Sequence, residues 1–164
     1  MVLGVKKIRD HEARKLLRTD ADIHAAVRAW CGEWEWGRSQ GKPVCKVCGD
    51  PVAAEREYGH ISQWDTEQVT SMYRLFLHMG EFNEDISRWR VHNVTDMQFM
   101  FRYAESFDQD LSQWEVGNVE RMDYMFYCAY SFNQDLSGWD VRKVKDKERM
   151  FWGADSLRKR PNWY

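Results

Sequence analysis

Residues 82–104 read FNEDISRWRVHNVTDMQFMFRYA, and residues 107–129 repeat that wording as FDQDLSQWEVGNVERMDYMFYCA. The pattern recurs with a period of 25 residues, and its clearest marker is a column of tryptophans: Trp64, Trp89, Trp114 and Trp139. A fixed period between about 20 and 50 residues is typical of a chain that stacks copies of one supersecondary unit. The sequence therefore predicts four units, at 60–84, 85–109, 110–134 and 135–159.

Each unit combines two patterns. Residues 85–91 alternate polar and apolar side chains and are rich in β-branched and aromatic residues, which predicts a short strand. The apolar residues that follow are spaced as on one face of a helical or 3₁₀ turn (Met97, Met100, Phe101, Ala104). One strand and one helical turn per unit are typical of leucine-rich repeats. We therefore expect an α/β repeat fold, a short leucine-rich-repeat-like solenoid whose equivalent Trp, Met and Phe side chains form core columns.

The pattern F-N-x-D-[IL]-S-x-W-x-V-x-N-V-x-x-M-x-x-M-F-x-x-A is similar to the BspA-like leucine-rich repeats, in the branch first noted in mycoplasma surface lipoproteins. The resemblance covers residues 60–157. It implies a solenoid that binds proteins or surfaces without catalysis. Such repeats also occur in algal and large-virus proteins, commonly behind a short helical N-terminus. The last unit departs from the pattern, with Lys147 for the first Met and Leu157 for the Phe, as expected of a terminal repeat.

The segment before the repeats predicts a helical N-terminal cap. Apolar residues at Ile23, Val27 and Trp30 predict a helix over 20–31, and residues 6–18 form a more polar helical candidate. A further helix is expected from Asp50-Pro51 to the stop at Gly59. These helices would shield the first repeat from water. We expect three parts: a cap with a Cys-containing loop at 1–59, a four-repeat solenoid at 60–159 and a C-terminal tail at 160–164.

The cap contains three cysteines, Cys31, Cys45 and Cys48. A C-x-x-C-G turn with a further upstream Cys has the form of half a zinc knuckle. No fourth ligand is evident nearby, so a zinc site, a redox pair and plain loop thiols all stay open. The chain otherwise predicts no cofactor.

Charge and hydropathy limit the classes of partner. Residues 60–134 carry 12 acidic and 5 basic side chains, which disfavours nucleic acid as a partner. No run of 18 apolar residues predicts a membrane span. The first apolar stretch is too short for a secretory signal, and four cysteines indicate no disulfide framework. An intracellular or virion-internal location, without a membrane anchor, is expected.

Positions that vary among the repeats are the candidates for function. Two such variable positions directly follow the Met-Phe pair, and each forms a column when the repeats are aligned. Phe99 and Tyr124 form another column one helical turn earlier. Aromatic and Arg side chains dominate binding hot spots. We therefore predict a partner-binding surface, with packing against the cap or the C-terminal Trp163-Tyr164 as the alternative; its residues are Phe99, Arg102, Tyr103, Tyr124, Tyr127 and Trp152. The column Asp85, Asp110 and Asp135 indicates either a cation ladder or, as we favour, carboxylates that accept backbone N–H groups.

No nucleotide-binding loop, nucleophile elbow or H-E-x-x-H motif is found, and the histidines are scattered, so the chain is predicted not to be an enzyme. The function expected is a protein-binding repeat module. The alternatives are a structural or cementing subunit of a larger complex or virus particle, and a zinc-stabilised adaptor.

Overall fold

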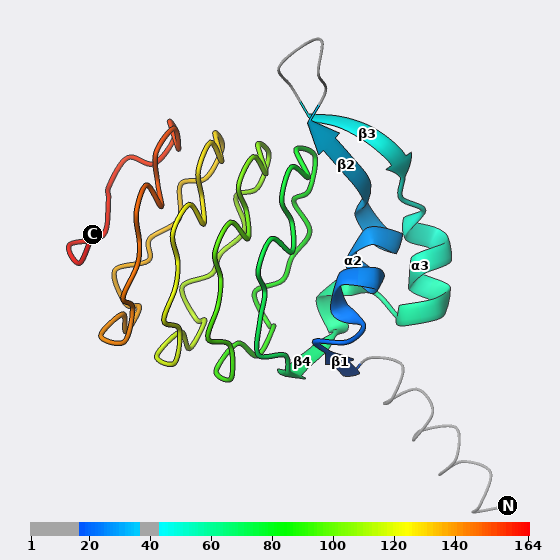
Figure 1. The fold of residues 1–164 in the computed structure, drawn as a ribbon, viewed down its shortest axis with the longest axis horizontal. Helices are drawn as coiled ribbons and strands as arrows, with labels where there is room; N and C mark the ends of the chain where they lie inside the picture. The colour runs from blue at the N-terminus through cyan, green and yellow to red at the C-terminus, as the bar shows by residue number, and fades with distance from the viewer. Residues whose placement is uncertain (1–16, 37–42) are drawn as a thin grey trace, which may run out of the picture.

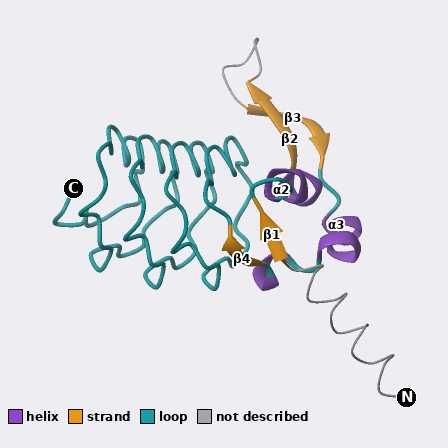
Figure 2. Cartoon of the chain, turned by 60° about the horizontal axis from the view of Figure 1, so that its bottom comes forward, coloured by secondary structure: helices purple, strands orange, loops and turns teal. Residues whose placement is uncertain are grey.

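The computed structural model describes residues 17–36 and 43–164, with the side chains of 33–48 left aside. The repeats lie side by side in chain order, while the helices and strands gather at one end (Figure 1). Viewed by secondary structure, the repeat region is drawn almost wholly as turns and loops (Figure 2). The molecule is therefore elongated along the direction in which the repeats follow one another.

The N-terminal elements form two small sheets and two helices. Strand β1 pairs with β4 in parallel, and β2 pairs with β3 as an antiparallel hairpin. The elements are β1 (Leu17–Thr19), α2 (Ile23–Cys31), β2 (Gly32–Trp36), β3 (Pro43–Cys48), α3 (Pro51–Tyr58), the 3₁₀ turn η1 (Ile61–Gln63) and β4 (Asp65–Gln68).

Two predicted helices are confirmed. Helix α2 occupies most of 20–31, and its apolar side is fully buried. Helix α3 begins as expected: Ala53 N donates to the Asp50 carboxylate at 3.0 Å, and Gly59 ends the helix with a φ of 74°. Of the third candidate, over 6–18, the last two residues belong to strand β1 and the rest lies outside the described residues.

These elements cover the tryptophan of the first repeat. Trp64 is 3 % exposed, with the Trp30 ring at 6.4 Å and the Arg18 guanidinium 5.2 Å from its ring centroid. Asp20, just before α2, accepts from Thr70 N at 2.7 Å and from Ser71 N at 3.2 Å. Apolar contact and charge-assisted hydrogen bonds thus both fasten the N-terminal elements to the first repeat.

Stacked phenylalanines form the centre of the repeats. The column Phe76, Phe101, Phe126 and Phe151 has successive ring centroids 5.4, 5.3 and 5.6 Å apart. A second column, Phe82, Phe107 and Phe132, packs against the first with ring centroids about 4 Å apart within each unit. All these rings are at most 6 % exposed. Each unit therefore buries the phenylalanines of these two columns against the next copy, as repeat architectures require.

The backbone of each unit differs from the expected strand and helical turn. Residues 85–91 form no strand, and parallel bridges instead join Ser71, Asp96, Arg121 and Asp146. Beyond the bridge, alternate N–H groups donate to the next repeat; Phe101 N, for example, bonds Met125 O at 2.8 Å. The intervening N–H groups close turns three residues back. In an α-helix each of these N–H groups would bond a carbonyl of its own unit. The bonds between repeats therefore exclude an α-helix here.

The tryptophan column also bonds the backbone. The indole N–H groups of Trp89, Trp114 and Trp139 each donate to the carbonyl 28 residues earlier, at 2.9, 3.2 and 2.9 Å. Trp163 continues this series: it stacks on Trp139 at 6.4 Å and donates to Leu136 O at 3.0 Å. Residues 160–164, expected to be a tail, thus continue the pattern of the repeats.

Candidate binding surface

The six residues predicted for partner binding lie together at the surface. Phe99 stacks on Tyr124 with ring centroids 5.2 Å apart, and Tyr127 stacks on Trp152 at 4.8 Å. Tyr127 also contacts Tyr124 and Tyr103, each at 5.6 Å. Trp152 is 56 % exposed and the others are half-buried. We call this set the aromatic face: Phe99, Arg102, Tyr103, Tyr124, Tyr127 and Trp152.

Arg102 occupies the middle of the aromatic face. Its guanidinium carbon lies between 5.0 and 5.5 Å from the ring centroids of Phe99, Tyr103, Tyr124 and Tyr127. A cation at this distance is attracted by the ring electrons. Among the described residues, Nε of Arg102 is buried without a hydrogen-bond partner and the guanidinium pairs with no carboxylate. The rings therefore hold the charge in place but do not neutralise it.

Left-handed backbone positions carry three of the aromatic rings. Phe99, Tyr103 and Tyr124 have φ of 58°, 59° and 56°. Each is the third residue of a hydrogen-bonded turn, where Gly or Asn is favoured. A residue with a Cβ costs roughly 1–2 kcal/mol in this conformation. The same N–H groups donate to the next repeat at 2.9–3.1 Å, which helps to offset that cost.

The aromatic face continues into the first repeat, which the sequence prediction missed. Tyr73 meets Phe99 edge to face at 5.9 Å, Arg74 lies 5.3 Å from the Phe99 ring centroid, and His78 contacts Tyr103 at 5.0 Å. Burial, and then the charges of Arg102 and Arg74, lower the pKa of His78 to about 4. Arg74 and His78 occupy the columns of Phe99 and Tyr103, which was the available signal, whereas Tyr73 belongs to neither column.

The aspartate column has the structural role that was favoured. Ser87 N, Ser112 N and Ser137 N donate to the carboxylates of Asp85, Asp110 and Asp135 at 2.9, 2.8 and 2.9 Å. Side-chain turns of this kind bend the chain locally.

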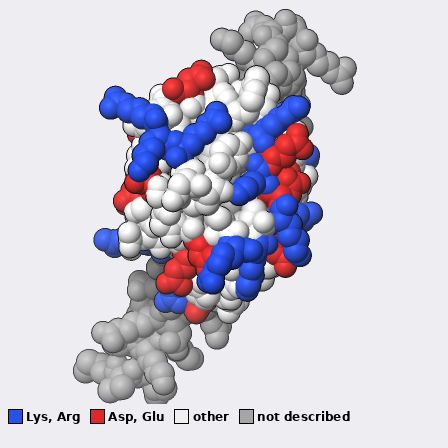
Figure 3. All heavy atoms as spheres, turned by 90° about the vertical axis from the view of Figure 1, so that its left-hand side faces the viewer, with Lys and Arg blue, Asp and Glu red and all other residues white. Residues whose placement is uncertain are grey.

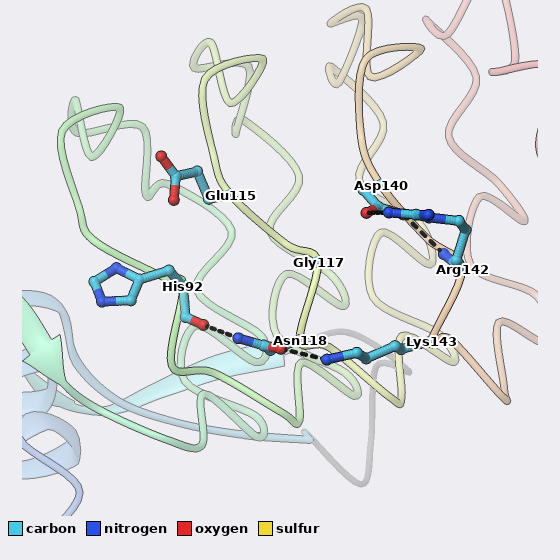
Figure 4. A pocket seen from close by; sticks show the side chains of 7 residues that line it. All are labelled: His92, Glu115, Gly117, Asn118, Asp140, Arg142 and Lys143. Atoms are coloured by element: carbon cyan, nitrogen blue, oxygen red, sulfur yellow. Dashed lines mark hydrogen bonds and ion pairs between the residues drawn. The ribbon is translucent and has the colours of Figure 1, made fainter.

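The repeats also contain a surface groove, separate from the aromatic face, that the sequence did not predict. It has a volume of about 500 Å³ and opens where Gly117 replaces the larger side chains of the equivalent residues (Figure 4). Arg142 forms an ion pair with Asp140 at 2.7 Å, and Lys143 Nζ donates to the neutral amide oxygen of Asn118 at 2.6 Å. We call this set the charged groove: His92, Glu115, Gly117, Asn118, Asp140, Arg142 and Lys143.

The predicted zinc ligands are only partly described. Cys31 is half-buried, and burial, followed by the charge of Glu84, raises the pKa of its thiol to about 12. Cys45 and Cys48 lie in β3, whose side chains are outside the described set, although the hairpin register places Cys48 opposite Gly32. Among the side chains that are described, no group of three His, Cys, Asp or Glu could hold a metal ion.

Comparison with known proteins gives one match. Residues 52–163 match the family described as "Mycoplasma protein of unknown function, DUF285". No curated protein and no solved structure matches the chain. In the described part of the chain, no helix is long and apolar enough to cross a membrane.

Proposed function

We propose that this chain, which belongs to the DUF285 family of mycoplasma proteins of unknown function, is a non-catalytic protein-binding repeat module that contacts its partner through the aromatic face. The proposal includes the finer fold class, a short BspA-like leucine-rich-repeat solenoid. Parallel bridges between successive units and the phenylalanine columns support that class. The position of the face on the repeats rather than the cap supports the binding role.

The aromatic rings at left-handed backbone positions are the observation that carries the proposal. At Phe99, Tyr103 and Tyr124 the backbone favours Gly or Asn, and Gly153 occupies the Tyr103 column in the last repeat. These rings are only half-buried, so they contribute less to the core than the phenylalanine columns. The left-handed turn recurs at equivalent positions such as Arg74, His78, Cys128 and Arg149, so it belongs to the repeat backbone. The presence of partly exposed aromatic rings at these positions is what supports a binding role.

The experiment replaces two rings. The double variant Tyr103→Ser, Tyr127→Ser removes the centre of the face but leaves the phenylalanine and tryptophan columns intact. Full-length wild-type and variant proteins would be immobilised, exposed to extract from the source cells, crosslinked and analysed by quantitative mass spectrometry. We expect a protein crosslinked to the aromatic face of the wild type to be lost from the variant, because aromatic anchors dominate binding energy.

The matched control is His92→Ser, Arg142→Ser, which alters the charged groove instead. It should retain the same partner, and both double variants should melt close to the wild type. Retention of every crosslinked partner by the tyrosine variant would refute the proposal. So would a large fall in melting temperature, because the rings would then be structural.

A further inference from the structure

The uncompensated guanidinium at the centre of the aromatic face indicates what the partner presents there. We infer that the face binds an acidic, extended segment of a partner protein, with a carboxylate of that segment paired to Arg102. This inference rests on the proposed function and adds the chemistry of the partner. It does not depend on the charged groove or on the cysteines.

The first argument is the charge of the face. Among the described residues, Arg102 lies among four rings and pairs with no carboxylate. Glu148 does contact the face, but it accepts from the Tyr124 hydroxyl at 3.4 Å and pairs with Arg149 at 3.3 Å. Arg74 lies 4.9 and 5.3 Å from the ring centroids of Tyr73 and Phe99. Several cations elsewhere on the repeats do have acidic partners: Arg90 bonds Glu67 and Arg121 bonds Asp96, both at 2.5 Å. Arg102 differs from these cations because aromatic rings, rather than a carboxylate, surround its guanidinium.

The second argument is the geometry of the cation. A guanidinium is planar and offers paired N–H donors that match the two oxygens of a carboxylate. Rings of Phe99, Tyr103, Tyr124 and Tyr127 surround this plane, so its orientation is set before a partner arrives. Little rotamer freedom remains to be lost on binding, and part of the half-buried side chain stays accessible.

The third argument is the surrounding apolar surface. Tyr127 and the exposed Trp152 form a stacked pair beside the guanidinium, and Phe99 and Tyr124 form another. An extended segment could place its carboxylate on Arg102 and its apolar side chains on these pairs. Seen from the C-terminal end of the molecule, both basic and acidic side chains surround a largely uncharged area (Figure 3).

The same residue types could also suit single-stranded nucleic acid, which uses cations and stacking rings. The charge of the repeats favours the peptide. The repeat body at 60–134 has 12 acidic and 5 basic side chains, which repel an oligonucleotide, with a charge on every nucleotide, more strongly than an extended segment in which only alternate residues are acidic.

The test uses defined probes on the full chain. Fluorescein-labelled peptides of ten residues, alternating Glu-Pro or Gln-Pro, and a ten-nucleotide oligothymidine would be titrated by fluorescence anisotropy at low and physiological salt. We expect the Glu-Pro peptide to bind about ten-fold more tightly than the Gln-Pro peptide, since one charge-assisted pair contributes about that factor. The oligonucleotide should bind more weakly than the Glu-Pro peptide.

The decisive variant is Arg102→Leu, because Leu77 occupies this column in the first repeat and the chain already accepts leucine there. It should abolish the preference for Glu-Pro over Gln-Pro. Arg142→Leu removes a cation from the charged groove and should leave the preference unchanged. Equal binding of the two peptides, tighter binding of the oligonucleotide, or an unchanged preference in Arg102→Leu would each overturn the inference.

The inference and the proposed function can fail separately. If a partner is lost from Tyr103→Ser, Tyr127→Ser but retained by Arg102→Leu, the binding role stands and the acidic-segment inference falls. If the tyrosine variant retains every crosslinked partner, the proposed function itself fails.

Discussion

Replacing Trp114 by alanine tests whether the tryptophan column stabilises the repeats. The indole is 3 % exposed, donates to Ile86 O at 3.2 Å and packs against Phe101 with ring centroids 6.4 Å apart. Loss of a buried tryptophan costs about 3–5 kcal/mol, and a stranded carbonyl adds to this. We expect the free energy of unfolding of Trp114→Ala to fall by about 4–5 kcal/mol, a large part of a typical domain's stability.

Trp163 provides a matched control in the same column. It makes the equivalent bond, to Leu136 O at 3.0 Å, but it is only half-buried. Trp163→Ala should therefore cost about half as much, because less apolar surface leaves the core.

Urea unfolding followed by circular dichroism measures both variants, with the denaturant slope as a second readout. A smaller dependence of the unfolding free energy on urea concentration (the m-value) in Trp114→Ala would show that the outer repeats unfold separately from the rest. Equal costs for the two variants, or a cost below about 1 kcal/mol for Trp114→Ala, would refute the role of the column in the core.

Three further predictions concern the turns and the cap. Gly153→Ala should lower stability by about 1–3 kcal/mol in thermal unfolding, because φ is 74° and an added Cβ would lie 2.9 Å from Cys128 Sγ; an unchanged melting temperature would contradict this. Because the folded state lowers the pKa of His78 to about 4, its protonation should reduce stability as pH falls from about 6.5 to 4. His78→Asn tolerates the φ of 65° and should reduce that loss, and urea midpoints with the same pH dependence as wild type would disprove it. Asp20→Ala should cost about 1–2 kcal/mol and speed amide exchange at Thr70 and Ser71, whereas exchange at Thr95, which bonds Thr70 O, serves as the control; equal acceleration at all three would argue against a local fastening.

Several structural features could be predicted from residues that are close together in the sequence or that repeat at a fixed period. The start of α3 follows from Asp50-Pro51 and its end from Gly59, because capping depends on adjacent residues. The six residues of the aromatic face could be grouped from their columns, because an exact period brings equivalent positions together in stacked units. The turns after Asp85, Asp110 and Asp135 were likewise predictable from aspartate followed by serine two residues later.

Other features depend on neighbouring repeats and could not be read from one unit. Apolar spacing over 85–104 suited a strand and a helical turn, but cross-repeat bonds and left-handed residues at Phe99 and Tyr103 replace both. Trp163 follows Trp139 by 24 residues rather than 25, so its place in the column escaped the periodic pattern. The charged groove needs side chains from three successive units around Gly117.

The 25-residue repeat and its apolar columns were determined by the sequence alone, because periodic burial needs only the order of residues. Only the tertiary structure decided that Arg102 lies among four rings, with no carboxylate paired to it in the described part of the chain. Tyr124 and Tyr127 come from the next unit, and left-handed turns direct Phe99, Tyr103 and Tyr124. The physical reason is that these contacts depend on how adjacent units hydrogen-bond, which no single stretch of the chain specifies.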